Sequence, residues 1–321
     1  MIPARAFWLT AKGRGVLRRE AVPDPAPDWC VVRTMYSAVS PGTERLVASG
    51  RVPAAVRDEM RCPYMGGRFP FPVKYGYSLV GEVAEGPMGI GGRKVHLLHP
   101  HQDICVVRTE DVHPLPDGLP AARATLASNL ETAVTAVWDA GVMIGERALI
   151  VGFGVIGSLV ARVLGLGPAV ELDIAEKRAD RRRLAEKMGF RAAPAPDAKP
   201  YDLAFDTSGT AAGLQTALNS VGLEGRVVAV SWLGAGPARI DLGGSFHSRR
   251  KRIISSQVSR VPAALGPRWD AARRTALVFR LLERPEFDLH IGPAVPFARL
   301  PRAFPALIRP TSGGLSPLIV Y

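Results

Sequence analysis

The segment from Gly152 to Gly157, GFGVIG, carries the most specific chemical pattern in the sequence. It closes the apolar run ALIV and opens an apolar helical run, the context in which a GxGxxG pattern indicates a dinucleotide-binding turn. Gly152 would allow the tight turn, Gly154 would let the backbone approach a pyrophosphate, and Gly157 would permit close helix–strand packing. The pattern predicts a nicotinamide cofactor. A glycine turn used only for packing, or a site for a flavin or another nucleotide, are the alternatives.

An acidic residue follows the turn at the spacing expected of a ribose ligand. Asp173 ends the run AVELD, about 20 residues after the first glycine. A carboxylate there accepts hydrogen bonds from the ribose hydroxyls and repels a 2′-phosphate, so the sequence favours NAD. Arg178, a few residues further on, would offset that repulsion, which keeps NADP as the alternative cofactor.

The elements that must position these residues fall into a β-rich front, a region of alternating strands and helices, and a tail. Short apolar runs such as CVVRTMYSAV, separated by Pro and Gly turns, make up the front. From residue 147 on, wholly apolar strands alternate with helices, which indicates a parallel sheet buried on both faces. We therefore expect an α/β fold, with a doubly wound Rossmann sheet inserted between the front and a tail that returns to it.

Composition and charge narrow the possible partners. The 321 residues are 47% hydrophobic, enough for a sizeable core in two domains. The net charge is +12, and its excess lies mostly in two arginine-rich clusters, at 177–183 and 249–252. A solvated basic surface is the simplest interpretation, and an anionic substrate or cofactor phosphate is the second. We expect no nucleic-acid partner, because no nucleic-acid-binding motif or aromatic-interleaved basic stripe occurs.

Cysteine usage and apolar runs indicate the compartment. The three cysteines, Cys30, Cys62 and Cys105, are far apart and form no CxxC pair. This argues for a reducing cytosol, and against a disulfide framework or a structural zinc lobe. The apolar runs are too short or too interrupted to span a bilayer, and the N-terminus lacks the order of a signal peptide. We expect a soluble, cytoplasmic protein with no membrane partner.

Histidines stand in two suggestive segments, HLLHPHQD and SFHSRR. His99 and His101 would share one face of a strand, but Pro100 breaks the strand between them. Only Asp103 lies nearby as a further ligand, so a metal site is not favoured. We assign His101 to substrate contact or proton relay, with a packed or surface histidine as the alternative. His247 and its arginine neighbours would grip an anionic substrate, and the alternative is an exposed basic loop.

Several motifs occur together in one order along the chain: MYSAVSPGTERLVASG, YGYSLVGEV, NLETAVTAVWDAG, GFGVIG, DTSG and the tail HIGPAVPFARLPRAFPALI…SGGLSPLIVY. In this the chain resembles the medium-chain dehydrogenase/reductase superfamily. SAVSPGTERL and NLETAVTAVWDAG make it most similar to the bacteriochlorophyllide hydroxyethyl dehydrogenase branch. The resemblance implies a GroES-like β-barrel catalytic domain, residues 1–124 and 259–321, split around a Rossmann NAD(P)-binding domain, residues 125–258. It also implies a homodimer or homotetramer.

The zinc-ligand positions implied by the resemblance hold poor zinc ligands. The first falls on Ser40, the histidine–glutamate pair on Tyr77 and Ser78, and the third near Ser128. Zinc needs thiolate, imidazole or carboxylate donors, and a neutral hydroxyl is a poor one. We expect no metal ligands and no catalytic zinc.

A hydrogen-bond donor can take the place of the metal, because hydride transfer to a carbonyl builds negative charge on oxygen. Tyr77 is the candidate donor, with Lys74 as the cation that lowers its pKa toward working pH. A packed wall residue is the alternative. Ser40 would hydrogen-bond the substrate oxygen or relay a proton, unless it only forms a Ser-Pro turn. Glu44 on the same loop would orient a donor or bind a substrate group.

The resemblance places the segment NLETA beside the nicotinamide ring. It implies that Thr132 packs under the ring and that Asn129 contacts the substrate. Glu131 lies on the apolar face of a helix, where an unpaired carboxylate is costly, so it is either exposed or functional, and we assign it to the catalytic group. Further cofactor contacts are assigned to Val155, Ile156, Ser208 and Ser231.

These assignments predict a zinc-independent, NAD(P)-dependent oxidoreductase that interconverts a secondary alcohol and a ketone by hydride transfer. Its small-molecule substrate would be fairly large and anionic. Two alternatives remain: a reductase of an activated C=C bond of the quinone or enone type, and a non-catalytic NAD(P)-binding regulator.

Overall fold

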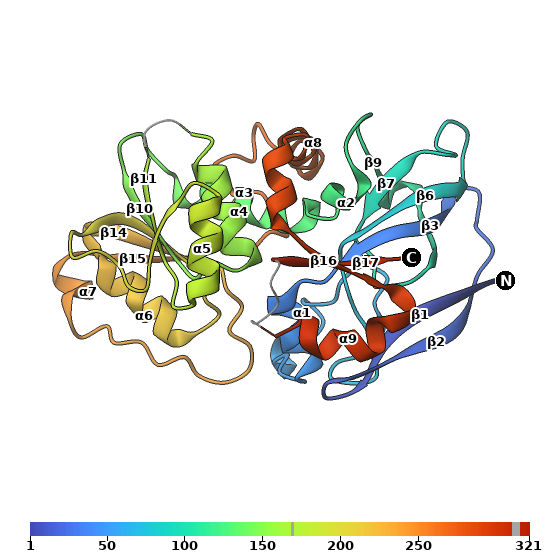
Figure 1. Ribbon diagram of the computed structural model, residues 1–321, viewed down its shortest axis with the longest axis horizontal. Helices are drawn as coiled ribbons and strands as arrows, with labels where there is room; N and C mark the ends of the chain where they lie inside the picture. Colours follow the sequence, from blue (N-terminus) through green and yellow to red (C-terminus); the bar gives the residue numbers. More distant parts are fainter. Residues whose placement is uncertain (168–169, 310–314) are drawn as a thin grey trace. The chain divides into compact units, whose positions relative to one another are not determined.

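The computed structural model describes residues 1–167, 170–309 and 315–321. The chain divides into two compact units: unit 1, residues 1–128 with 279–321, and unit 2, residues 129–278 (Figure 1). Residues 312–314 of the tail motif, and residue 169 at the start of the predicted strand AVELDI, lie outside the described residues. The units divide after residues 128 and 278, while the domain boundaries predicted from the sequence, after 124 and 258, stay predictions.

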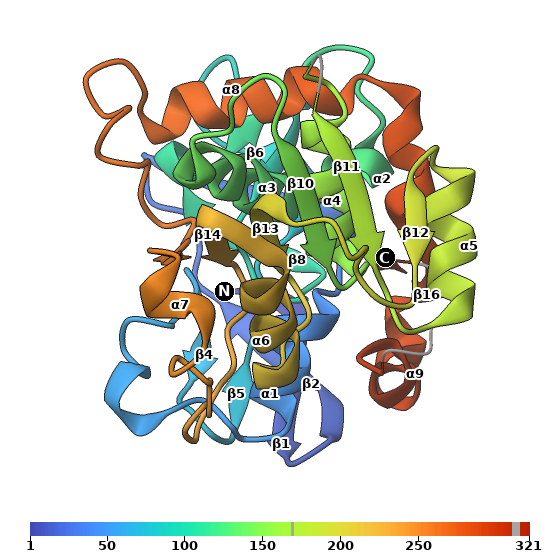
Figure 2. The same cartoon turned by 90° about the vertical axis from the view of Figure 1, so that its left-hand side faces the viewer.

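Unit 2 contains a six-stranded sheet in the order β12-β11-β10-β13-β14-β15, parallel throughout (Figure 2). Its strands are β10 (Arg147–Val151), β11 (Glu171–Ala175), β12 (Arg191–Ala193), β13 (Tyr201–Asp206), β14 (Val221–Ala229) and β15 (Arg252–Ser255). The chain runs outward from the centre twice, first from β10 and then from β13, which is the doubly wound Rossmann order. Because Ala148, Leu149 and Ile150 are fully buried, the apolar runs do form a sheet covered on both faces.

Four helices connect these strands: α4 (Val155–Leu164), α5 (Ala179–Lys187), α6 (Ala211–Ser220) and α7 (Ser245–Ser248). Along the chain, α3 (Ala127–Ala140), which begins at the unit boundary, precedes the first strand, and α8 (Ala271–Leu282), which ends in unit 1, follows the last. The side chain of Thr210 caps α6 by accepting a hydrogen bond from the Gly213 N–H. Leu214, Ala217 and Leu218 of α6 join Tyr201 and Val227 of the sheet in one buried cluster.

Unit 1 contains two sheets. One has the order β16-β17-β3-β6-β7-β9, with β8 also paired to β3, and the other has the order β2-β1-β5-β4. The strands are β1 (Ile2–Ala11), β2 (Arg14–Val22), β3 (Trp29–Ala38), β4 (Gly66–Gly67), β5 (Val73–Lys74), β6 (Leu79–Glu85), β7 (Lys94–Leu97), β8 (Ile104–Arg108), β9 (His113–Pro114), β16 (Ile291–Pro296) and β17 (Ser316–Val320). The tail strand β17 pairs antiparallel with β3, Leu318 opposite Ala38, so the tail joins the front of the chain.

Short helices complete unit 1: α1 (Pro41–Ala48), η1 (Ala54–Val56), η2 (Thr109–Asp111), α2 (Ala121–Ala124), η3 (Pro285–His290), η4 (Phe297–Arg299) and α9 (Leu300–Leu307). Cys30, Leu79, Val95 and Cys105, on four different strands, lie in one buried cluster. No helix within the described residues is long and apolar enough to cross a membrane.

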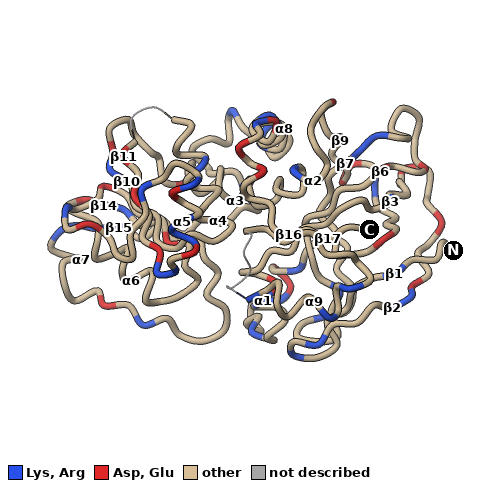
Figure 3. The backbone as a smooth tube through the Cα atoms, in the orientation of Figure 1, with Lys and Arg blue, Asp and Glu red and all other residues tan. Residues whose placement is uncertain are grey.

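The basic clusters are partly neutralised within unit 2, where blue and red positions lie close together on the tube of Figure 3. Arg178 pairs with Asp180, and both Arg250 and Arg252 pair with Glu224. At least three of the nine cationic side chains in the two clusters are therefore paired with carboxylates of the same chain.

Candidate cofactor site and hydroxyl cluster

The glycine turn between β10 and α4 is shaped by close backbone contacts. Gly152 has φ +94°, and a Cβ there would lie 2.9 Å from the Ser208 Cα. A Cβ on Gly157 would lie 2.2 Å from the Gly152 carbonyl oxygen. A Cβ on Gly154 would meet only the Arg181 guanidinium, at 3.2 Å. Gly152 and Gly157 are thus required by packing, whereas Gly154 leaves room beside the start of α4.

The start of α4 has the properties of an anion site. Gly154 is its N-cap and supplies no side-chain hydrogen bond, so the first amide hydrogens of the helix are not capped by that residue. Arg181 reaches this turn from α5, and its Nη1 donates to the Phe153 carbonyl oxygen at 2.8 Å. A bare helix N-terminus with a guanidinium beside it fits the pyrophosphate of a dinucleotide. The sequence pattern gave no signal for Arg181 apart from its place in the basic cluster.

The predicted ribose ligand, Asp173, needs correction. It lies in the middle of β11, opposite Leu149, and its carboxylate accepts hydrogen bonds from Arg147, Arg191 and Tyr201. Arg147 and Tyr201 begin β10 and β13, so this buried network faces the amino ends of the strands, away from the glycine turn. Burial alone would raise the pKa of Asp173, but the hydrogen bonds from Arg191 and Tyr201 outweigh it and lower that pKa.

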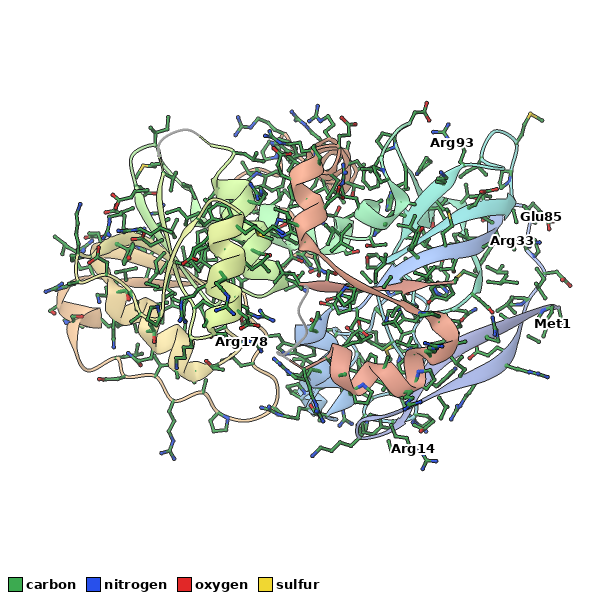
Figure 4. All side chains as sticks on the ribbon, viewed as in Figure 1. Met1, Arg14, Arg33, Glu85, Arg93 and Arg178 are labelled. Carbon is green, nitrogen blue, oxygen red and sulfur yellow. The ribbon has the colours of Figure 1, made fainter. Side chains whose placement is uncertain are left out.

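Glu176 occupies the position that the sequence analysis gave to Asp173. It follows the last residue of β11, and its carboxylate accepts hydrogen bonds from the N–H of Phe153, 2.7 Å, and of Arg178, 2.8 Å. The available signal was its place as the first polar residue after the apolar end of the strand. Arg178, labelled in Figure 4, precedes α5, and its guanidinium is paired with Asp180.

Four other predicted cofactor residues lie at the same edge of the sheet. Val155 and Ile156 form the first turn of α4. Ser208 follows β13, touches the glycine turn through its backbone, and donates to the buried Asp206 carboxylate at 2.6 Å. The Ser231 hydroxyl accepts from the Gly209 N–H at 3.0 Å. The carboxyl ends of β10, β13 and β14 therefore bring these residues together, as expected for a nucleotide site of this topology.

In unit 1, Ser40, Thr43 and Tyr77 form a hydroxyl cluster. Tyr77 donates to the Thr43 Oγ1 at 3.3 Å, and Ser40, the N-cap residue of α1, is buried. Burial raises the pKa of Tyr77 to about 12, although the Ser40 and Thr43 hydroxyls lower it in part. Tyr77 is thus a neutral phenol at physiological pH and can donate a hydrogen bond or a proton.

The predicted role of Lys74 is wrong. Its ammonium donates to Glu20 at 2.8 Å and to Gln102 at 2.7 Å. The pKa of Tyr77 is raised, not lowered, and Lys74 is not among its causes.

Glu44 and His101 form a buried pair next to the cluster. One oxygen of Glu44 accepts from the Ser40 N–H at 2.7 Å, and the other lies 3.1 Å from His101 Nε2. The Nδ1 of His101 lies 2.7 Å from the Ser37 hydroxyl, which lies 2.9 Å from the Tyr321 hydroxyl. The structure therefore brings together Ser40, Glu44, Tyr77 and His101, and adds Ser37 and Tyr321, which sequence reasoning missed because they are distant in the chain.

The hydroxyls at the implied zinc positions serve other purposes. Ser78 donates to the Thr125 carbonyl oxygen, and Ser128 donates to the Tyr77 carbonyl oxygen at 2.8 Å. Among the described residues, no group of three His, Cys, Asp or Glu side chains is arranged to hold a metal ion. Neutral hydroxyls already bonded to backbone carbonyls do not fit the donor set of zinc.

The segment NLETA lies on α3, with Asn129, Leu130 and Ala133 buried. Glu131 accepts a 2.5 Å hydrogen bond from Thr275 and lies 3.7 Å from the Arg274 guanidinium. Its carboxylate is therefore held by α8, which corrects the predicted catalytic role. Asn129 is 1% exposed, and its Nδ2 has no hydrogen-bond partner among the described residues, so it keeps a donor for a ligand. Thr132 is half-buried on the same helix.

His247 does not reach the cofactor edge. It is exposed on α7, which immediately precedes β15 at the amino end of the parallel sheet, opposite the glycine turn. Lys251 beside it is buried and donates to the Leu218 carbonyl oxygen. The predicted grip of His247 on a substrate is therefore corrected.

Comparison with known proteins agrees with this architecture. A D-guloside 3-dehydrogenase from Shigella flexneri is 24% identical over 216 residues, 63% of this chain and 62% of the relative. A 2-desacetyl-2-hydroxyethyl bacteriochlorophyllide A dehydrogenase from Cereibacter sphaeroides is 30% identical over 206 residues, 58% of this chain and 60% of the relative. The solved structure of acetophenone reductase from Geotrichum candidum in complex with NAD has a TM-score of 0.80 at 16% identity, covering 99% of this chain and 97% of that one.

The fold matches that of solved dehydrogenase structures at 15–18% identity, with TM-scores of 0.79 to 0.81. The predicted combination of a Rossmann sheet with a GroES-like catalytic domain is thereby confirmed. No family model matches the chain. The matches span 62% and 60% of the length of the two curated relatives, so they relate this chain to only part of each.

Proposed function

We propose that the protein is a zinc-independent, NAD(P)-dependent oxidoreductase that interconverts a secondary alcohol and a ketone by hydride transfer. The observation that carries the proposal is the glycine turn, which joins β10 to α4 at the carboxyl edge of a six-stranded Rossmann sheet. The names of the two curated relatives, a guloside 3-dehydrogenase and a hydroxyethyl bacteriochlorophyllide dehydrogenase, support oxidation of an alcohol.

The residues of unit 2 fit a nicotinamide dinucleotide. The amides at the start of α4 and the Arg181 guanidinium would hold the pyrophosphate, and Glu176 would accept hydrogen bonds from the ribose. A buried carboxylate at the ribose position repels a 2′-phosphate, and Arg178 is engaged by Asp180, so we propose NAD as the preferred cofactor and NADP as the weaker one. When bound, the nicotinamide supplies or accepts the hydride.

The residues of unit 1 would manage the proton. In the direction of reduction, the Tyr77 hydroxyl donates its proton to the substrate oxygen as the carbonyl carbon receives the hydride. The products are the alcohol and the oxidised cofactor, and the tyrosinate recovers a proton from solvent. Thr43 and Ser40 hold the phenol in place through their hydroxyls. A positioned donor of this kind contributes about 3–4 kcal/mol in a dry site.

The names of the two curated relatives bear on the class of substrate. A guloside and a bacteriochlorophyllide are larger than simple alcohols, which supports a fairly large substrate. An anionic substrate has less support. His247 lies at the amino end of the parallel sheet, opposite the glycine turn, and Arg250 and Arg252 pair with Glu224.

A fluorescence titration with NADH and NADPH, followed by turnover assays on ketones, enones and secondary alcohols, tests the proposal. We expect binding of NADH in preference to NADPH and turnover of at least one ketone–alcohol pair. Turnover of enones alone would favour a C=C reductase, and binding without any turnover would favour a regulator; either result would refute the proposal.

Zinc independence is tested separately by metal analysis of the purified protein and by a chelator. We expect well below one zinc ion per chain and unchanged turnover after dialysis against EDTA. If the protein contains one zinc ion per chain and loses turnover when that zinc is removed, zinc independence is refuted. The hydroxyl residues Ser40, Tyr77 and Ser128 would then not indicate the absence of a catalytic zinc.

A further inference from the structure

The Glu44–His101 pair of unit 1 is a buried ionisable pair that the proposed reaction does not itself use. Glu44 is 2% exposed and His101 is fully buried. Every strong hydrogen-bonding atom of the two side chains has a partner: Ser40 N–H and His101 for Glu44, and Glu44 and Ser37 for His101. Burying a carboxylate is costly unless it is paired in this way, so the pair is a specific arrangement and not a packing accident.

The pair is tied directly to the segment that carries Tyr77. Gly76 has φ +141°, and a Cβ there would lie 3.2 Å from the His101 ring, so the backbone beside Tyr77 passes over the imidazole. From the other side, Glu44 bonds the N–H of Ser40 and so closes the first turn of α1, which carries the Ser40 and Thr43 hydroxyls. Both partners of the Tyr77 phenol are therefore set by Glu44.

Five of the ionisable side chains around the pair are neutral, whereas Lys74 and Asp103, which also act on this neighbourhood, are held in ion pairs with Glu20 and Arg5. Burial raises the pKa of Cys62 and of Tyr77 to about 12 and raises those of Tyr75 and Tyr321 well above the usual value. Burial also lowers the pKa of His99 to about 3. Among the charges of this neighbourhood, that of Glu44 acts on the Tyr77 phenol.

We propose that Glu44 and His101 are the positioning pair of the Tyr77 donor: together they fix the first turn of α1 and the backbone at Gly76 on either side of the phenol. This inference rests on the proposed function, because it assigns a task within that reaction. Neither residue touches the substrate, and the effect of each passes through Tyr77. Consistent with this, the Glu44 charge is one of the causes that raise the pKa of Tyr77.

The experiment compares four variants of the full-length protein: Glu44→Gln, which keeps the shape and removes the charge; Glu44→Asp, which restores the charge; His101→Gln; and the control His113→Gln. His113 is a half-exposed histidine of β9 in the same unit, outside this network. Each is assayed for kcat of ketone reduction against pH, for NADH affinity, and for the ionisation of Tyr77 by ¹³C-tyrosine NMR, with Tyr77→Phe to assign the signal.

We expect Glu44→Gln to lower kcat about tenfold and to make Tyr77 about tenfold more acidic, so that an alkaline limb appears in its kcat profile at lower pH than in the wild type. Glu44→Asp should restore the Tyr77 signal in part. His101→Gln should lower kcat by a similar factor, and NADH affinity should stay unchanged in all variants, because the cofactor turn is in unit 2.

Three results would overturn the inference. A folded Glu44→Gln protein with unchanged kcat and unchanged Tyr77 ionisation shows that the pair has no such task. A loss of kcat together with NADH affinity, without a shift of the Tyr77 signal, shows a merely structural role. Absence of ketone or alcohol turnover in the wild type refutes the proposed function and this inference with it. If the wild type is active but the variants do not show the expected changes, only the inference is refuted.

Discussion

The cofactor turn of unit 2 and the hydroxyl cluster of unit 1 are built on opposite principles. The turn is one short segment, Gly152 to Gly157, whose function depends on backbone atoms and on missing side chains. The hydroxyl cluster and its supporting pair depend on side chains that come from residue 37 to residue 321, brought together by strands β3, β6, β8 and β17. A backbone site can be recognised in a local sequence, whereas a side-chain site of this kind needs the whole fold.

The largest effect should come from removing the phenol of the hydroxyl cluster. We expect Tyr77→Phe to lower kcat of ketone reduction about 100-fold, because the developing charge on the substrate oxygen loses its donor. NADH affinity, measured by fluorescence, should not change.

Tyr75→Phe is the matched control for this variant. Tyr75 is buried and packs edge-on against Tyr77 with ring centroids 6.1 Å apart, so the same change is made in the same neighbourhood. Similar losses of kcat in both variants would mean that packing, and not the Tyr77 hydroxyl, is responsible.

A pair of glycine variants tests the backbone site. A Cβ on Gly157 would lie 2.2 Å from a backbone carbonyl oxygen, so Gly157→Ala should lower the free energy of unfolding by about 3 kcal/mol and abolish NADH binding. Gly154→Ala meets only a flexible arginine at 3.2 Å and should unfold like the wild type in urea while binding NADH more weakly. If Gly154→Ala binds NADH with wild-type affinity, the pyrophosphate does not approach the turn at this residue.

Variants of two carboxylates of unit 2, Asp173 and Glu176, should affect different properties: the free energy of unfolding and the affinity for NADH. Asp173→Asn should lower the free energy of unfolding by about 2 kcal/mol at pH 7, because its charge-assisted hydrogen bonds to Arg191 and Arg147 are weakened. The pKa of Asp173 is lowered by folding, so this contribution is present above the ordinary pKa of about 4 and is lost as the pH falls through the lower, folded value. The difference between variant and wild type should therefore vanish in strong acid.

Glu176→Gln should act mainly on binding. We expect about tenfold weaker NADH binding and improved relative affinity for NADPH, measured by the same titrations. The free energy of unfolding should fall by about 1 kcal/mol, because the glutamine oxygen can accept from only one of the Phe153 and Arg178 N–H groups. A loss of NADH affinity in Asp173→Asn but not in Glu176→Gln would restore the original assignment of the ribose ligand.

Much of the fold was predictable from local pattern. Apolar runs such as Ala148 to Val151 predicted a buried parallel sheet, and the glycine spacing predicted where the turn lies, because both depend on neighbours in sequence. Asp173 shows that spacing along the sequence is not sufficient to identify a ligand. Its distance from the glycine turn suited a ribose ligand, yet Arg147 and Tyr201, on adjacent strands, donate hydrogen bonds to its carboxylate. Strand pairing, which no spacing rule contains, decided between Asp173 and Glu176.

The candidate catalytic residues were predictable as residue types but not as a network. Tyr77 and Ser40 attracted attention because they stand where metal ligands are implied, but Lys74 was assigned to Tyr77 by proximity in sequence, and its ammonium belongs to Glu20 and Gln102. Glu131 was recognised as a carboxylate needing a partner, and α8 supplies Thr275 and Arg274. In each case the partner lies on an element far away in the chain.

The sequence by itself determined the Rossmann sheet, the position of the cofactor turn and the presence of poor zinc donors at the implied ligand positions. These follow from periodicity, from glycine geometry and from the chemistry of donor atoms. Only the tertiary structure decided that Glu176 stands at the strand end, that Tyr77 is a buried phenol whose pKa is raised to about 12, and that Glu44 and His101 form a buried pair. The reason is physical: burial and hydrogen-bond pairing set the charge and the direction of a side chain, and both are created when distant strands meet.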